Sequence, residues 1–285
     1  MSWRKKVVIF VLAVSVFFVW YAVFAESRDG LMVYFFDVGQ GDSIFIQVEN
    51  GTQILIDGGP DDAVLAELGR VMPFYDRTID MVVLTHPDAD HLNGLVEVLE
   101  RYRVKTVLET GVKHETAQYA EWNKRLSERG IPIVHAVRGQ VFRIDDGLML
   151  SVLAPFSSQN EKEAKKINNT GVVARLDYYD TSLLFTADIE KDIEEILAAV
   201  FADSIDADVL KVAHHGSKTS SVADFLAAVT PEAAVISVGK SNRYGHPAPE
   251  VLNRFENIKA RIFRTDIDGA VVLRADENGY AFIRQ

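Results

Sequence analysis

Apolar and polar residues alternate along the first half of the chain in a way that predicts a series of β-strands. The strand-like segments 32–37, 43–48 and 53–57 are separated by short turns, and Asn50-Gly51 is a typical hairpin turn. The longer apolar run 79–85 is typical of a strand that is buried on both faces. Apolar stripes at helical spacing accompany these strands, and helices are expected at residues 61–72, 92–102 and 117–129.

The second half of the chain repeats this order of strands and helices. Strands are expected at residues 171–178, 181–186, 207–212, 233–238 and 261–264, followed by a closing hairpin through 270–273 and 280–283. Helices are expected at residues 189–201, 222–229 and 249–255. Two halves of this kind predict an α/β fold in which two sheets pack face to face and helices cover the outside.

The N-terminus carries the longest apolar stretch of the chain, residues 7–24, directly after Arg4, Lys5 and Lys6. As a helix this stretch spans roughly 27 Å, close to the thickness of a bilayer core. Residues 1–25 are therefore predicted to be an uncleaved single-pass transmembrane helix that places a C-terminal domain, residues 31–285, outside the cytoplasm. The alternative is a cleavable signal sequence ending at Ala25, which would give a secreted protein.

The composition supports a large core and limits the chemistry of the chain. Of the 285 residues, 48% are hydrophobic and none is cysteine, so neither a disulfide nor a thiolate metal ligand is available. The net charge of −11 is unfavourable for a protein that only binds nucleic acid, because such binding normally begins with neutralisation of phosphate. Bound divalent cations would offset part of this charge locally.

Two imidazoles and two carboxylates lie within six positions directly after the predicted strand 79–85. These residues, 86–91, read His-Pro-Asp-Ala-Asp-His. Imidazole nitrogen and carboxylate oxygen are ligands of divalent metal ions, and Pro87 prevents the chain from entering a helix at once. We interpret the segment as a loop that directs several side chains at a metal ion, in preference to a polar loop that only caps the next helix.

Three later strand ends also carry residues of the ligand type, namely Asp188, the pair His214-His215, and His246. In layered α/β folds the loops at one edge of the sheets gather into a common site. We therefore expect all four strand ends to contribute to one site.

The motifs at these strand ends make the chain similar to a known family. They are Phe-Asp-Val-Gly-Gln-Gly-Asp-Ser at 36–43, Ile-Asp-Gly-Gly at 56–59, Thr-His-Pro-Asp-Ala-Asp-His at 85–91, His-His-Gly-Ser at 214–217 and Tyr-Gly-His-Pro at 244–247. From residue 32 onward the chain resembles the metallo-β-lactamase superfamily, and more narrowly the hydrolase domain of ComEC-type competence proteins and its free-standing relatives. The resemblance implies a four-layer αββα sandwich with one or two divalent metal ions at the strand ends.

The resemblance also implies a role for individual residues. The metal ligands would be His86 and Asp88 for a first ion, Asp90 and His91 for a second, Asp188 as the bridging carboxylate, and His214 as the late histidine. His215 competes with His214 for this last role, because successive residues leaving a strand face opposite ways and the sequence does not decide between them.

The sequence departs from the general signature of the superfamily in two places. Asp88 stands where the signature has histidine, and the region of a further histidine holds Asn168-Asn169. Oxygen ligands shift the preference of a site away from zinc, so zinc and manganese both remain candidate cofactors. His114 and His135 are interpreted as surface or structural histidines.

These residues favour a metal-dependent hydrolase, and the resemblance suggests a phosphodiesterase or nuclease that acts on DNA, with single-stranded DNA as a partner in competence and DNA uptake. Asp90 would orient the attacking water, and Lys218 and His246 would contact the phosphate. Two alternatives stay open: hydrolysis of another ester or an amide, and a non-catalytic binding module with a weakened metal site. A single apolar stretch suggests that the chain does not itself transport DNA.

Overall fold

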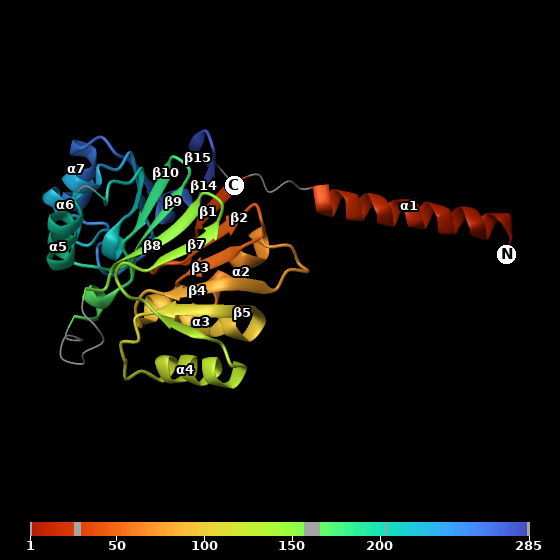
Figure 1. The fold of residues 1–285 in the computed structure, drawn as a ribbon, viewed down its shortest axis with the longest axis horizontal. Helices are drawn as coiled ribbons and strands as arrows, with labels where there is room; N and C mark the ends of the chain where they lie inside the picture. The colour runs from red at the N-terminus through yellow and green to blue at the C-terminus, as the bar shows by residue number, and fades with distance from the viewer. Residues whose placement is uncertain (1, 26–29, 157–165, 203, 284–285) are drawn as a thin grey trace.

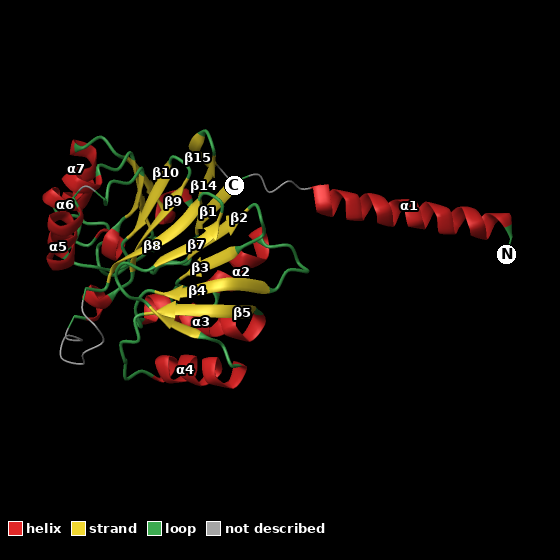
Figure 2. Ribbon diagram, viewed as in Figure 1, coloured by secondary structure: helices red, strands yellow, loops and turns green. Residues whose placement is uncertain are grey.

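Two β-sheets lie face to face in the computed structural model, and helices cover the outer face of each sheet (Figure 1). The structure describes residues 2–25, 30–156, 166–202 and 204–283. Figure 2 shows the strands of both sheets gathered between the two groups of helices. The predicted αββα sandwich is therefore confirmed.

The first sheet has eight strands in the order β15-β14-β1-β2-β3-β4-β5-β6. The four strands β3, β4, β5 and β6 run parallel to one another, so their carboxyl ends share one edge of the sheet. The bounds are Leu31–Phe35 for β1, Ile44–Val48 for β2, Gln53–Ile56 for β3, Thr78–Leu84 for β4, Arg103–Glu109 for β5, Ile133–His135 for β6, Val271–Asp276 for β14 and Gly279–Ile283 for β15.

The second sheet has seven strands in the order β13-β12-β11-β10-β9-β8-β7. Here β10, β11, β12 and β13 are parallel, which again brings their carboxyl ends to one edge. The bounds are Val141–Asp145 for β7, Leu148–Ala154 for β8, Val173–Tyr178 for β9, Thr181–Phe185 for β10, Val209–Lys211 for β11, Ala233–Ile236 for β12 and Arg261–Arg264 for β13.

Three apolar clusters hold these layers together. The central cluster joins the inner faces of both sheets, where the ring of Phe35 from β1 lies 6.4 Å from the ring of Phe185 from β10. A second cluster packs α2 (Ala63–Val71), α3 (Ala89–Arg101) and α4 (Ala117–Arg129) on the first sheet, and a third packs α5 (Lys191–Phe201), α6 (Ala223–Val229) and α7 (Pro249–Asn257) on the second. Short helical turns complete the described chain at η1 (Ile167–Thr170), η2 (Ala213–Gly216) and α8 (Thr265–Asp268).

Helix α3 begins inside the metal-ligand motif. It has an apolar face of Leu92, Leu95 and Leu99, which are all buried against the first sheet, and this face fixes the rotation of the helix. The helix starts at Ala89, with Asp88 as the last extended residue before it, because Pro87 lies outside the helix and does not obstruct it. The prediction that residues 86–91 form a loop is therefore wrong for Asp90 and His91, which lie in the first helical turn.

Helix α1 (Trp3–Ala25) precedes the sandwich. Within the described part of the chain, no helix is both long and apolar enough to cross a bilayer. The transmembrane helix predicted at residues 1–25 is therefore not supported. The alternative cleavage point after Ala25 adjoins residues 26–29, which lie outside the described residues. The predicted location outside the cytoplasm stays a prediction that cell fractionation would measure.

A buried carboxylate in α5 makes the stability of the sandwich depend on pH. Glu194 accepts hydrogen bonds from the backbone N–H of Ser221 (2.7 Å) and of Val222 (2.9 Å), and burial raises the pKa of Glu194 to about 7. The folded protein then holds this proton more tightly than the unfolded chain, whose glutamate titrates near 4.5. Folding stability is therefore expected to fall by about 3 kcal/mol through this group as the pH rises from about 4.5 to above 7.

Urea unfolding at pH 5 and pH 8 measures this effect. Glu194→Gln is expected to show a smaller loss of stability between the two pH values than the wild type, by about 2.5 kcal/mol. Glu128→Gln, at an exposed position of α4, is the control and should behave as the wild type does. Equal pH dependence of wild type and Glu194→Gln would assign the titration to other groups.

Candidate metal centre

The residues predicted as metal ligands lie at the carboxyl ends of strands in both sheets. Residues 86–91 follow β4, Asp188 follows β10, and His214 and His215 lie in η2 directly after β11. The loops at these strand ends face one another across the edge of the sandwich. Side chains that are about a hundred residues apart in sequence therefore meet in space.

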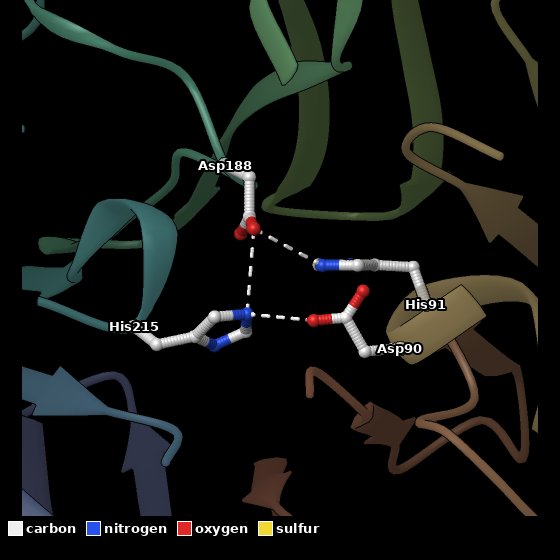
Figure 3. A group of neighbouring side chains, drawn as sticks. All are labelled: Asp90, His91, Asp188 and His215. Atoms are coloured by element: carbon white, nitrogen blue, oxygen red, sulfur yellow. Dashed lines mark ion pairs between the residues drawn. The ribbon is translucent and has the colours of Figure 1, made fainter. Parts of the chain in front are cut away.

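Four of these side chains form the metal cluster, which we define as Asp90, His91, Asp188 and His215 (Figure 3). Asp188 Oδ2 lies 3.4 Å from His91 Nε2 and 3.3 Å from His215 Nε2, and Asp90 Oδ2 lies 3.3 Å from His215 Nε2. One candidate ligand atom from each residue falls within 4.8 Å of all the others. Such a group of nitrogens and oxygens can hold a divalent cation.

The backbone of η2 decides which histidine enters the cluster. His214 and His215 have φ values of 51° and 54°, in the left-handed region that residues with a side chain rarely adopt, and Gly216 follows with φ of 78°. The chain thus leaves β11 in a left-handed turn, so the strand alternation does not continue. His215 is buried in the cluster, whereas the side chain of His214 is 23% exposed at its rim.

The second ring nitrogen of each cluster histidine has a fixed partner. His91 Nδ1 donates to Asp57 Oδ2 (2.8 Å), and His215 Nδ1 donates to the backbone oxygen of Ser237 (2.9 Å). Asp57 is itself held by Thr85, which donates from its backbone N–H (2.8 Å) and from Oγ1 (2.6 Å). These bonds fix the ring orientations and leave each Nε2 directed at the cluster, as in many metal sites.

A buried ion pair lies behind His215. Lys211 Nζ donates to Asp42 Oδ2 over 2.7 Å, and both side chains are almost fully buried. Asp42 Oδ1 lies 3.4 Å from His215 Nδ1. Burial raises the pKa of Asp42, but Lys211 and His215 outweigh it and hold the pKa well below its usual range. The pair joins β11 of the second sheet to the loop after β1 of the first, so it braces the edge at which the cluster forms.

Buried polar atoms without a hydrogen-bond partner point to a ligand at this place. Among the described residues they include Nε2 of His86, His91 and His215, and Oδ1 of Asp188. Leaving such atoms unpaired is costly, and a bound cation would satisfy them together. The donor set of imidazole nitrogens and carboxylate oxygens fits a divalent metal ion.

The protonation of the cluster supports the same conclusion. Burial raises the pKa of Asp188, but His215 and His91 outweigh it and hold the pKa well below 3.8. Burial lowers the pKa of His91 and of His215, but the carboxylates, led by Asp188, raise both values well above 6.5. The protonated rings of His91 and His215 thus supply the positive charge that stabilises the buried carboxylate of Asp188. A divalent cation could supply the same charge in their place.

The residues predicted for a first metal ion lie beside the cluster. The rings of His86 and His91 are 4.1 Å apart, and His86 Nε2 lies 3.7 Å from Asp88 Oδ2. Burial and the charge of His91 lower the pKa of His86 to about 3, so this imidazole is neutral at pH 7. His114 Nε2 lies 3.8 Å from Asp88 Oδ1, which places His114 nearer to this group than its interpretation as a surface histidine suggested.

Of the remaining predicted residues, His214 and His246 lie on the rim of the cluster. His214 Nε2 is 3.9 Å from Asp188 Oδ2 and 3.5 Å from Asn168 Nδ2, and the ring of His246 is 5.8 Å from the ring of His214. Asn169 has a different role, because its Oδ1 accepts a hydrogen bond from the backbone of Glu190 (2.8 Å). Lys218 is exposed on the turn that follows η2.

Three supporting residues were not predicted from the sequence, namely Asp42, Asp57 and Lys211. A lysine inside an apolar strand such as β11 is a signal that could have been used, since a buried lysine requires a partner of opposite charge. Asp42 and Asp57 belong to motifs that carry the family resemblance, but the sequence does not reveal which charges they face.

Comparison with known proteins identifies relatives of the whole sandwich. The family model described as the metallo-beta-lactamase superfamily matches residues 36–240. ComE operon protein 3 of Bacillus subtilis (strain 168) is 34% identical over 84% of this chain and 32% of its own length. Competence protein ComA of Neisseria gonorrhoeae is 30% identical over 89% of this chain and 34% of its own length. The chain thus spans about a third of each of these relatives.

Among solved structures, the metallo-beta-lactamase fold protein YhfI of Bacillus subtilis superimposes with a TM-score of 0.57 at 12% identity, covering 86% of this chain and 99% of its own. At this identity the similarity concerns the fold alone.

Proposed function

The chain belongs to the metallo-β-lactamase superfamily and is related to competence proteins, and from this premise we propose that it is a metal-dependent phosphodiesterase that acts on DNA. The observation that carries the proposal is the metal cluster, in which Nε2 of His91, Nε2 of His215 and Oδ1 of Asp188 are buried without a hydrogen-bond partner. DNA is proposed as the substrate because the relative from Neisseria gonorrhoeae is named a competence protein.

We propose that the cluster residues, with His215 in place of His214, hold one divalent ion, and that His86 and Asp88 contribute to a second. Zinc and manganese are both candidates, because the donors mix imidazole and carboxylate. When bound, such an ion lowers the pKa of water towards 7 and offsets the negative charge of the phosphate. Asp42, Asp57 and Lys211 are positioning residues in this proposal.

The residues on the open side of the cluster would act on water and substrate. The side chain of Asp90 is 33% exposed, the most of the four, so it is the member that an attacking water reaches first and the one proposed to orient it. Burial, together with the charges of His214 and His215, lowers the pKa of His246. His246 is therefore a neutral hydrogen-bond donor to a phosphate oxygen at pH 7, whereas Lys218 can offer a full positive charge.

Hydrolysis of a different ester or of an amide is the second candidate function. The net charge of −11 favours it, because a polyanion such as DNA is repelled by most of the surface. The third reading, a non-catalytic binding module, predicts a cluster that binds metal without turnover.

The purified protein, loaded with manganese or zinc, is expected to cleave single-stranded DNA and bis-p-nitrophenyl phosphate. Asp90→Asn should lower both activities by about a hundredfold, within the range of general base catalysis, while Asp146→Asn, at an exposed turn on the opposite end of the strands, should leave them unchanged. Metal content is measured alongside by mass spectrometry.

The outcomes separate the candidate functions. Cleavage of the small diester without cleavage of DNA would reject the nuclease and retain a broader hydrolase. Metal binding without turnover of any ester or amide would favour the binding module. Equal activity of the wild type and Asp90→Asn would reject the role proposed for Asp90.

A further inference from the structure

An exposed aromatic side chain stands on the loop that presents His246. The loop, residues 239–247, connects β12 to α7 at the same edge of the sandwich as the metal cluster. Tyr244 is 57% exposed, and Lys240 and Arg243 beside it are exposed as well. An aromatic ring beside exposed cations is unexpected on a protein of net charge −11.

Hydrogen bonds hold this loop in one shape. The side chain of Asn242 donates to the backbone oxygens of Gly239 (3.0 Å) and His246 (2.8 Å), and it accepts from the backbone N–H of His246 (2.9 Å). The loop is also fixed to η2, because the backbone N–H of Ala248 donates to Gly216 (2.8 Å). Pro247 packs so closely on Gly216 that a Cβ there would lie 2.6 Å from it. Tyr244 is therefore exposed on a rigid support.

Three aromatic rings lead from the cluster to the surface. His214 Nε2 lies 3.9 Å from Asp188 Oδ2, the His214 and His246 rings are 5.8 Å apart, and the His246 and Tyr244 rings are 5.8 Å apart with an angle of 15° between their planes. Arg243 lies over the ring of Tyr244, with its guanidinium carbon 5.2 Å from the ring centre, and one of its nitrogens donates to the tyrosine hydroxyl (3.2 Å).

We propose that Tyr244 and Arg243 form a nucleotide subsite, in which Arg243 leaves the ring of Tyr244 to bind a phosphate and an unpaired base takes its place on that ring. The subsite rests on the function proposed above and specifies its substrate as single-stranded nucleic acid. A duplex hides both faces of each base, whereas an unpaired base has a free face for stacking on a tyrosine. Arginine suits the first role because it binds phosphate through two parallel N–H groups.

Binding to strands with and without bases isolates the stacking contribution. Fluorescence anisotropy is measured in EDTA, where hydrolysis does not interfere, with a short fluorescein-labelled oligothymidylate and an abasic strand of equal length. The wild type is expected to bind the thymidine strand about tenfold more tightly than the abasic strand, which matches the lower part of the range for stacking on an aromatic residue.

Substitutions test each half of the subsite. Tyr244→Ala should lose the preference for bases, Tyr244→Phe should keep it, and Tyr75→Ala should keep it too, because Tyr75 is 56% exposed but lies before β4, at the other end of the strands. Arg243→Ala should weaken binding of both strands by a similar factor and lower the slope of log affinity against log salt by about 0.7, the value for one single-strand phosphate contact.

The subsite is rejected if the wild type shows no preference for bases or if Tyr244→Ala retains it. Hydrolysis by the metal-loaded protein is scored separately. A preserved base preference without DNA cleavage would reject the nuclease and keep the subsite, whereas DNA cleavage without base preference would reject the subsite alone.

Discussion

Replacing Asp188 by asparagine is expected to lower phosphodiester hydrolysis by at least about a thousandfold and to remove most of the bound metal. Asp188 lies between both imidazoles of the cluster, and asparagine keeps its size but not its charge. A bound ion contributes several kcal/mol to transition-state stabilisation, and each 1.36 kcal/mol is about a factor of ten in rate. Loss of the ion therefore affects activity more than loss of any single hydrogen bond.

Metal content and thermal unfolding give two readouts of this change that do not depend on activity. At a metal concentration about a thousandfold above Kd, binding stabilises the folded state by about 4 kcal/mol, or roughly 10 °C in Tm for a domain of this size. Adding metal should raise the Tm of the wild type by this amount and leave that of Asp188→Asn unchanged. Asp208→Asn is a suitable control, because Asp208 is half-buried at the opposite end of β11, where it accepts hydrogen bonds from Ser182.

Full metal occupancy and full activity in Asp188→Asn would show that this carboxylate is not a ligand. Loss of activity with unchanged metal content would assign it to substrate or water instead. Either result would change the proposed site.

The adjacent histidines are expected to differ sharply when each is replaced by alanine. His215→Ala should lose at least about a hundredfold in activity together with its metal, because His215 Nε2 lies 3.3 Å from both carboxylates of the cluster. His214→Ala should lose about tenfold, because the side chain of His214 is partly exposed and contacts the cluster only at 3.9 Å. The two expected losses in activity differ because removing a metal ligand usually lowers activity more than removing a residue that only contacts the site.

Activity and metal content of the two variants, beside His135→Ala at the exposed edge strand β6, make this comparison. The three substitutions remove the same ring, so their differences report position alone. A larger loss in His214→Ala than in His215→Ala would restore the assignment that the family resemblance first suggested.

Much of the fold follows from the sequence because each layer has its own apolar pattern. The strand Thr78–Leu84 is rich in apolar residues, and α3 carries its apolar residues at helical spacing. The structure brings the motif 86–91 to Asp188 because both follow strands whose carboxyl ends lie at one edge of the sandwich. These patterns involve residues that are close together in the chain, so they can be recognised in a single sequence.

What the sequence did not reveal depends on contacts between the two halves or on unusual backbone shapes. The choice between His214 and His215 is set by a left-handed turn, which the residue types do not signal, since neither is glycine. The pair of Lys211 and Asp42 joins residues 169 positions apart, and His114 meets Asp88 only through the fold. The start of α3 was predicted three residues too late, at residue 92. Pro87 was expected to delay the helix, but a proline just before a helix is compatible with its start.

The cluster draws its four side chains from both sheets, so a bound ion would also act as a cross-link between distant parts of the chain. It would tie His91 to Asp188 and close a loop of about a hundred residues in a protein that has no cysteine. In the chain-entropy description a link across a loop of that length restricts the unfolded chain by about 4.7 kcal/mol. The ion that is proposed for hydrolysis would thus also do for this sandwich what disulfides do for secreted domains.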